Sequence, residues 1–318
     1  MAGEDKISNL PDDIINHILS FLDLKYAMQT SALSKRWKLS WTLLPQLNLD
    51  SYKFSSLSHF NKFVNHALLH RNNLREVSIL ELRCRELVTN ITSRRIVNYA
   101  GLHNIRRLKL ESTSTKYHKF PEFLFSCRAL EDLTLEFNFT SCDKRCHISE
   151  SGWDFPVLKN LIIIGRYDYC YPNVLNVVAP QLQNLTAHVE LVEVLHCRDP
   201  LHKSAVGFDS LEKVKLFWPD TLIQWATNFC VSRLLGVFHK LYSAKFLILD
   251  MDITELLSSC LERDQMLLEP FPFNNLKYLK MKTMVAQQHF VVPVQLKNYF
   301  LDKSPNVTFI TDNPHPQV

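Results

Sequence analysis

The stretch that decides the fold is ISNLPDDIINHILSFLDLKYAMQTSALSKRWKLSW, residues 7–41. It predicts an α-helix near its start, because Pro11 suits a first helical turn and the two aspartates after it favour the positive end of the helix dipole. Apolar residues follow at helical spacing and form a wide stripe: Ile14, Ile15, Ile18, Leu19 and Leu22. A second short helix is expected over 25–31, and Ser34 is expected to cap a third helix that carries Trp37 and Trp41.

These helices are too small to bury their own apolar residues. Three short helices in about 35 residues are marginally stable without further contacts. The apolar stripe therefore has to pack on another surface, either the rest of the chain or a second protein. For Ile18, Leu22 and Trp37 both alternatives stay open, since cores and interfaces share a composition. We expect the two tryptophans to rest on the segment that follows.

The helical stretch resembles the F-box. The resemblance is carried by the Leu-Pro-x-Asp-Ile-Ile string at 10–15, by Ile-Leu-Ser-Phe-Leu at 18–22, and by LSKRW at 33–37, which is similar to the plant F-box subfamily in particular. It implies docking onto the Skp-type adaptor of a Skp–cullin–F-box ubiquitin ligase. The residues that it places at or near the adaptor interface are Leu10, Pro11, Asp13, Ile14, Ile15 and Leu19. Asp13 stands where many members carry Glu, which is a conservative difference.

A second pattern begins at Leu44. The string LPQLNL (44–49) forms an L-x-x-L-x-L frame, and similar frames recur at 74–79, 105–110, 130–135, 158–163, 182–187, 211–216, 244–249, 276–281 and 304–309. The last two apolar positions of each frame face one side of a strand. A short strand that recurs at such intervals is typical of a leucine-rich-repeat solenoid, in which the strands stack into a parallel sheet. This array also resembles that of plant F-box proteins with leucine-rich repeats.

The expected fold class is therefore α/β. A three-helix F-box is expected over 7–43, an irregular leucine-rich-repeat solenoid with a curved parallel sheet over 44–311, and a disordered tail over 312–318. The stretches between frames predict helices at 58–70, 94–100, 121–127, 222–236, 253–261 and 293–301. No linker rich in Gly or Ser separates the F-box from the array, so we expect a rigid junction.

The exposed face of the predicted sheet offers a candidate binding surface. Residues that flank the two buried positions of each frame point the other way. Most are polar, but six are large and apolar: Ile162, Ile164, Phe217, Phe246, Ile248 and Tyr278. An exposed apolar patch rimmed by charge marks binding surfaces, so these residues are expected to contact a target protein. The alternatives are a misphased strand or a covering loop.

The sequence gives little support to catalysis. Only six glycines occur, and no phosphate-binding loop, nucleophile elbow or zinc-protease motif is present. Cys142, Cys146 and His147 form the one local cluster of metal-ligand types. No second pair follows at zinc-site spacing, which favours a loop with incidental cysteines. We expect no catalytic residue, no metal and no cofactor. We therefore expect that the protein is not an enzyme.

Charge and hydropathy limit the partners. A net charge of +4 does not by itself indicate nucleic acid. The stretch 62–110 is basic, but it lacks the interleaved aromatic residues of single-strand binding sites, and a solvated edge of the solenoid is the simpler interpretation. No signal-peptide core or membrane-spanning run is evident. We expect no nucleic-acid or membrane partner, and location in the nucleus or cytoplasm.

Two functions remain from this sequence. The first is a substrate-recognition adaptor of a Skp–cullin–F-box ubiquitin ligase. It would bind the Skp-type adaptor, and through it a cullin, and would hold a target protein near the conjugating enzyme, so that catalysis comes from proximity. The second is a ligase-independent scaffold that binds proteins through the repeat array alone. Binding to the Skp-type adaptor distinguishes the two functions, because only the first requires it.

Overall fold

The computed structural model describes residues 6–7, 9–71, 77–84, 90–115, 127–139, 153–167, 175–189, 192, 195–197, 208–218, 228–262, 273–281 and 294–311. The chain divides into two compact units, residues 1–142 and 143–318. The first unit holds both the helical stretch and the first repeats.

The first unit begins with four short helices: α1 (Asp12–Ser20), α2 (Leu24–Gln29), η1 (Thr30–Ala32) and η2 (Trp37–Leu43). The last two of these are 3₁₀-helices. The expected cap at Ser34 is wrong, because η2 begins after Arg36 and no side chain caps it. The guanidinium of Arg36 instead pairs with the carboxylate of Asp12 at 2.7 Å, which ties the last helix to the first.

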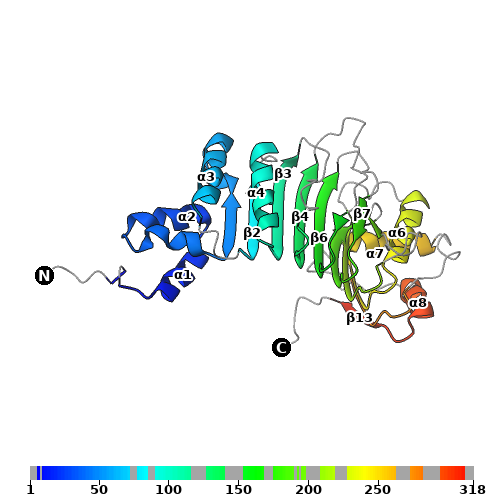
Figure 1. The fold of residues 1–318 in the computed structure, drawn as a ribbon. Helices are drawn as coiled ribbons and strands as arrows, with labels where there is room; N and C mark the ends of the chain where they lie inside the picture. Colours follow the sequence, from blue (N-terminus) through cyan, green and yellow to red (C-terminus); the bar gives the residue numbers. More distant parts are fainter. Residues whose placement is uncertain are drawn as a thin grey trace, which may run out of the picture. The chain divides into compact units, whose positions relative to one another are not determined.

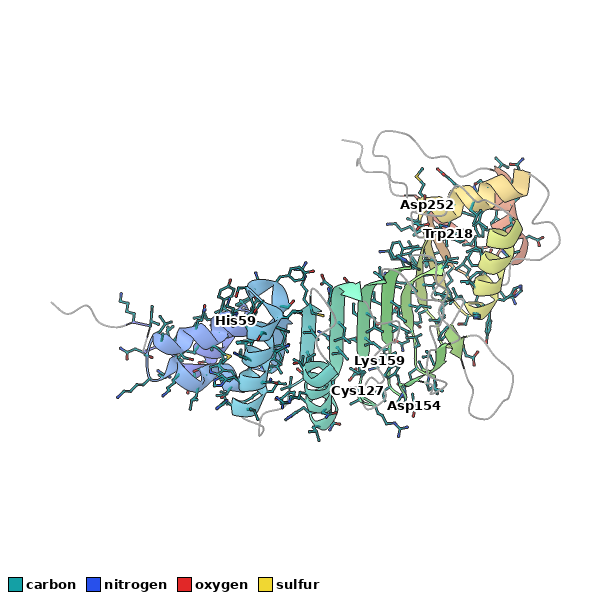
Figure 2. The ribbon with its side chains drawn as sticks, turned by 90° about the horizontal axis from the view of Figure 1, so that it is seen from above. His59, Cys127, Asp154, Lys159, Trp218 and Asp252 are labelled. Carbon is teal, nitrogen blue, oxygen red and sulfur yellow. The ribbon has the colours of Figure 1, made fainter. Side chains whose placement is uncertain are left out.

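The same unit continues into four parallel strands: β1 (Gln46–Asp50), β2 (Ile79–Cys84), β3 (Arg107–Thr115) and β4 (Asp132–Phe139). The short η3 (Ser51–Lys53) and α3 (Leu57–His70) lie between β1 and β2, and α4 (Asn90–Leu102) follows β2. Ser56 caps α3 by accepting a hydrogen bond from the backbone N–H of His59 (Figure 2). Helices α3 and α4 pack beside each other along the strands (Figure 1).

The second unit contains six parallel strands, ordered β6 (Asn160–Tyr167), β8 (Asn184–His188), β10 (Lys213–Phe217), β11 (Phe246–Leu249), β12 (Tyr278–Met281) and β13 (Thr308–Thr311). Helices α6 (Asn228–Lys240), α7 (Met251–Glu262) and α8 (Val294–Lys303) follow β10, β11 and β12 in turn. Lys159 lies directly before β6, and Trp218 lies directly after β10 (Figure 2).

The repeats at the start of the second unit return through strands. Strands β5 (Trp153–Asp154), β7 (Leu175–Val178) and β9 (Leu195–Cys197) precede β6, β8 and β10, and they pair into a separate parallel sheet. An extended segment covers the same length as a helix with fewer residues, because a strand rises about 3.3 Å per residue and a helix 1.5 Å. The 24-residue spacing between the frames at 158 and 182 is the shortest in the array, and that repeat returns through β7.

Burial confirms eight of the ten predicted frames. In each of them all three frame residues are buried. Within each unit the two strand positions pair in register with those of the next strand, as Leu185 does with Val214 and Val214 with Leu247. The alternation leaves the remaining strand residues on the opposite face. The fold is thus a leucine-rich-repeat array with a parallel sheet.

Two predicted frames are wrong in phase. The strand predicted at 74–79 lies three residues later, because Leu80 and Leu82 pair with Leu47 and Leu49 and are buried, while Ile79 faces the other side. In the last repeat Leu279 pairs with Phe309, which takes the position predicted for Val307. In both cases apolar residues occur at alternative spacings, so the pattern alone did not define the register.

Predicted helices 58–70, 94–100, 253–261 and 293–301 are confirmed as α3, α4, α7 and α8. The prediction at 222–236 overlaps α6, which extends to Lys240. Most of 121–127 and the tail 312–318 lie outside the described residues. No helix in the described part of the chain is long and apolar enough to cross a membrane.

The F-box stretch rests on the first repeat through residues 20–25. The side-chain amide of Gln46 donates to the carbonyl of Ser20, and the ammonium of Lys25 lies 4.6 Å from the centre of the Phe54 ring. Lys53 accepts a hydrogen bond from Lys25 at its carbonyl and pairs with Asp23 at 3.9 Å. These contacts support a fixed junction within the first unit. The expected contribution of Trp37 and Trp41 to it stays a prediction, although both are buried.

Arg71, at the end of α3, is a buried cation. It is only 4% exposed, and its three guanidinium nitrogens have no hydrogen-bond partner among the described residues. Burial lowers its pKa, and the nearby Tyr99 offsets this only in part. An uncompensated buried charge is costly.

Replacing Arg71 by Met is expected to raise the free energy of unfolding by about 1–3 kcal/mol, because Met keeps the apolar stem and removes the buried charge. Thermal unfolding followed by circular dichroism measures the change. The exposed Arg95 on α4 provides the matched control, and Arg95→Met should leave the midpoint nearly unchanged. A lower midpoint for Arg71→Met would show that the cation is compensated.

Tyr242 predicts a pH dependence in the second unit. Its hydroxyl donates a hydrogen bond to Asp209, which, together with burial, raises the pKa of Tyr242 to about 12. A raised pKa means that the stabilisation is complete below the unfolded-state pKa near 10 and is lost as pH rises to about 12. The difference in melting temperature between the natural chain and Tyr242→Phe should therefore shrink from pH 9 to pH 12. A difference that is constant over this range would contradict the hydrogen bond.

Candidate docking surfaces

Helix α1 has one buried and one exposed apolar side. Ile15 and Leu19, four residues apart, are fully buried. Ile14 and Ile18, also four residues apart, are 40% and 38% exposed, and Pro11 before them is exposed too. The helix therefore packs the F-box stretch with one side and presents the other to solvent.

The six residues predicted at the adaptor interface include both exposed and buried positions. Pro11, Asp13 and Ile14 are exposed and Leu10 is half-buried, so their side chains are accessible. The prediction is corrected for Ile15 and Leu19. Both have no exposed surface, because they pack against the inner side of the helical stretch, where Leu24, Ala27, Trp37 and Trp41 are buried as well.

Further exposed apolar residues of the F-box stretch were not in the predicted set. They include Phe21, Leu33 and Leu39, which are 76%, 55% and 65% exposed. Ile18, for which the sequence left core and interface open, is exposed, whereas Trp37 is buried and donates its indole N–H to the carbonyl of Ile7 at 3.2 Å. Sequence spacing identified the stripe, but it could not show which side of the stripe the short helices would cover.

The exposed sheet face of the first unit is charged and internally paired. Arg83 pairs with Glu111 at 2.8 Å, Arg107 with Asp132 at 2.6 Å, and Lys109 with Glu136 at 3.2 Å. These cations belong to the basic stretch 62–110, in which the sequence shows an excess of positive charge. On this face the acidic residues of β3 and β4 neutralise that positive charge.

The exposed sheet face of the second unit has a different character. Six of its side chains, which we call the lysine–aromatic face, are Lys213, Lys215, Phe217, Phe246, Tyr278 and Lys280, from β10, β11 and β12. Register places Lys213 beside Phe246 and Phe246 beside Tyr278. This face joins positive charge to aromatic surface over three neighbouring strands.

The six apolar residues predicted to contact a target all belong to the second unit. Ile162, Ile164, Phe217 and Phe246 are half-buried and Tyr278 is 43% exposed, so all five are accessible on the face that alternation predicted. Ile248 is corrected, because it is only 7% exposed. Register places it between Lys215 and Lys280, whose long apolar stems can cover it. That these residues contact a target stays a prediction.

No group of three or more His, Cys, Asp or Glu residues in the described part of the chain is placed to hold a metal ion. The cluster of Cys142, Cys146 and His147 lies outside the described residues. The candidate sites are therefore two kinds of protein surface: the exposed side of α1, and the sheet faces of the repeats.

Comparison with known proteins shows what the helical stretch and the whole chain are similar to. The F-box domain family matches residues 7–47. An FBD-associated F-box protein of Arabidopsis thaliana is 31% identical over 194 residues, which cover 53% of this chain and 41% of the relative. An F-box/LRR-repeat protein of the same plant is 30% identical over 168 residues, covering 50% of this chain and 33% of the relative.

A putative F-box/LRR-repeat protein of Arabidopsis thaliana matches over nearly the whole chain. It is 26% identical over 329 aligned positions, which cover 91% of this chain and 68% of the relative. With the two relatives above, the match spans less than half of their length. The matched F-box, the parallel repeat strands and these relatives agree with one another. The chain thus carries an F-box followed by a leucine-rich-repeat array, and it is similar to plant F-box/LRR-repeat proteins.

Proposed function

We propose that this protein is the substrate-recognition adaptor of a Skp–cullin–F-box ubiquitin ligase. Its F-box docks a Skp-type adaptor and through it a cullin, and its repeats capture a target protein. One observation carries the proposal: in a matched F-box, α1 leaves Pro11, Ile14 and Ile18 exposed after Ile15 and Leu19 have filled the core. Apolar residues that the chain itself does not cover suit a protein interface.

Such a ligase subunit needs no catalytic side chain. It raises the rate of ubiquitin transfer by holding the target beside the charged conjugating enzyme, which replaces an encounter in solution by a fixed arrangement. A fixed arrangement requires that the F-box moves little relative to the repeats. The contacts of Lys25, Lys53 and Gln46 limit this movement at the start of the array.

Co-precipitation from plant cells tests the proposal. With the proteasome blocked, the tagged natural chain should bring down both a Skp-type adaptor and a cullin, whereas Pro11→Ala combined with Ile14→Asp should bring down neither. Ile15 is unsuitable for this test, because an aspartate at a fully buried position would unfold the module. If the natural chain brings down no adaptor, the ligase function is lost, and the ligase-independent scaffold takes its place.

A further inference from the structure

A buried group of polar side chains lies where helices α3 and α4 of the first unit contact each other (Figure 1). Arg71, at the C-terminal end of α3, is 4% exposed, and Tyr99 of α4 is 7% exposed. The two side chains are close enough for each to act on the pKa of the other. The ring of His103 lies against Tyr99, with 4.1 Å between the ring centres. We call these three residues the Arg71 cluster.

The Arg71 cluster lacks hydrogen-bond acceptors. In the described part of the chain, neither the guanidinium nitrogens of Arg71 nor the hydroxyl oxygen of Tyr99 has a hydrogen-bond partner. A guanidinium has only donors, and a phenol that accepts from it still has its own proton to donate. Even a direct hydrogen bond between the two side chains would therefore leave most of these donors unpaired. Buried donors are normally paired in folded proteins, so the missing acceptor points to a bound water or a bound ligand.

The cluster also lacks a negative charge. The chain has no Asp or Glu at 51–75 or at 87–110, and these two stretches include all of α3 and α4. A water molecule would accept hydrogen bonds from Arg71, but it would leave the buried cation without a counter-charge, which is costly. An anionic ligand supplies the acceptors and the counter-charge together.

We propose that the Arg71 cluster binds the carboxylate group of a small ligand. The carboxylate would accept two parallel hydrogen bonds from the guanidinium of Arg71 and another from the hydroxyl of Tyr99. A planar carboxylate matches the fork of a guanidinium in both shape and charge. The ligand would link the end of α3 to α4. The inference does not depend on adaptor docking, because both helices lie outside the matched F-box at 7–47.

The charge of the cluster favours a carboxylate over a phosphate. Burial and the neighbouring Arg71 lower the pKa of His103, so its imidazole is neutral at pH 7 and Arg71 supplies the charge of the cluster. A carboxylate balances one positive charge, whereas a phosphate monoester carries about −1.5 to −2 at this pH. The excess negative charge of a phosphate would be buried without a partner.

Thermal unfolding of the full chain in a carboxylate-free buffer, with and without sodium acetate, tests the proposal. Acetate at about ten times its dissociation constant should lower the unfolding equilibrium constant about tenfold, and the effect should saturate below about 100 mM. Acetamide, which has a similar shape without the charge, and sodium chloride at the same ionic strength should have little effect. Inorganic phosphate should stabilise the chain less than acetate. No stabilisation by acetate, an equal effect of chloride, or a larger effect of phosphate would overturn the proposal.

Matched variants locate the site. Arg71→Met should abolish the effect of acetate, and Tyr99→Phe should weaken acetate binding about fivefold, because one hydrogen bond contributes about 1 kcal/mol. Arg95→Met, at an exposed residue of α4, should respond to acetate as the natural chain does. Arg71→Met is expected to fold, because it removes a buried charge and keeps the apolar stem. Arg71→Lys keeps the charge without the fork and should bind acetate more weakly than the natural chain. Equal stabilisation of Arg71→Met and the natural chain would show that acetate acts elsewhere.

The carboxylate could come from a free acid or from the C-terminus of a peptide, and calorimetric titration distinguishes these two sources. The probes are butyrate and the tetrapeptide Gly-Ser-Gly-Ala, prepared with a free and with an amidated C-terminus. Tighter binding of butyrate identifies a free acid as the ligand, and tighter binding of the free peptide identifies a chain terminus. Either result requires that the amidated peptide does not bind. Equal binding of the amidated and the free peptide would overturn recognition of a carboxylate.

Discussion

Replacing Ile14 by Asp is expected to weaken binding of the Skp-type adaptor by about 100-fold or more, with little change in the stability of the protein. Ile14 is 40% exposed on the outer side of α1, so the variant places a carboxylate in water while the chain is free. In the complex the same carboxylate would be buried without a partner, and loss of a central apolar anchor with burial of a charge costs about 3 kcal/mol or more. Isothermal titration calorimetry measures the affinity.

Two controls sharpen this result. Leu69→Asp makes the same kind of change at a residue of α3 that is 76% exposed and lies outside the F-box, and it should leave adaptor binding unchanged. Ile15→Ala removes a buried side chain next to Ile14 in the sequence, so it should lower the melting temperature first. If Ile14→Asp binds the adaptor as tightly as the natural chain, the exposed side of α1 is not the docking surface.

Leu185→Ala is expected to destabilise the second unit by about 2–5 kcal/mol. Leu185 of β8 is 1% exposed, and its register partners Leu161 and Val214 are buried on the same side of the sheet. Removing its side chain loses apolar burial and leaves a cavity that a continuous row of strands cannot easily close. Chemical denaturation with circular dichroism measures the loss.

The neighbouring residue provides the control for this second prediction. Thr186 lies on the opposite, half-buried face of the same strand, so Thr186→Ala should change stability by less than about 0.5 kcal/mol. Equal effects at the two positions would contradict the alternation that defines the sheet. A small effect at Leu185 alone would mean that the row of frame residues is not one packed core.

Much of this fold could be predicted because a repeat array reuses one local pattern. A frame such as Leu211, Val214 and Leu216 needs only a strand that buries alternate residues, and similar frames on either side strengthen the interpretation. The predicted register was wrong at β2 and β13, because Ile79 and Val307 are apolar residues that also fit the frame spacing. Only pairing with Leu47 in one case and Leu279 in the other resolves the register.

The candidate sites were less predictable, because they depend on which side of an element the chain covers. Ile14 and Ile15 are adjacent and chemically identical, yet one is exposed and the other is fully buried. Likewise, Ile248 follows the alternation of an exposed position, but Lys215 and Lys280 flank it. Whether a cation is neutralised also depends on the neighbouring strand, as Arg107 and Asp132 show. Such cross-strand relations are absent from a linear motif.

Titration of the purified natural chain with a plant Skp-type adaptor in a calorimeter tests the central claim most directly. We expect a one-to-one complex with a dissociation constant of about 1 µM or below, equivalent to at least about 8 kcal/mol of binding free energy. We also expect that Pro11→Ala combined with Ile14→Asp gives no complex while melting at the same temperature. The absence of a complex between the folded natural chain and the adaptor at tens of micromolar, or equal affinity of the double variant, would contradict the central claim.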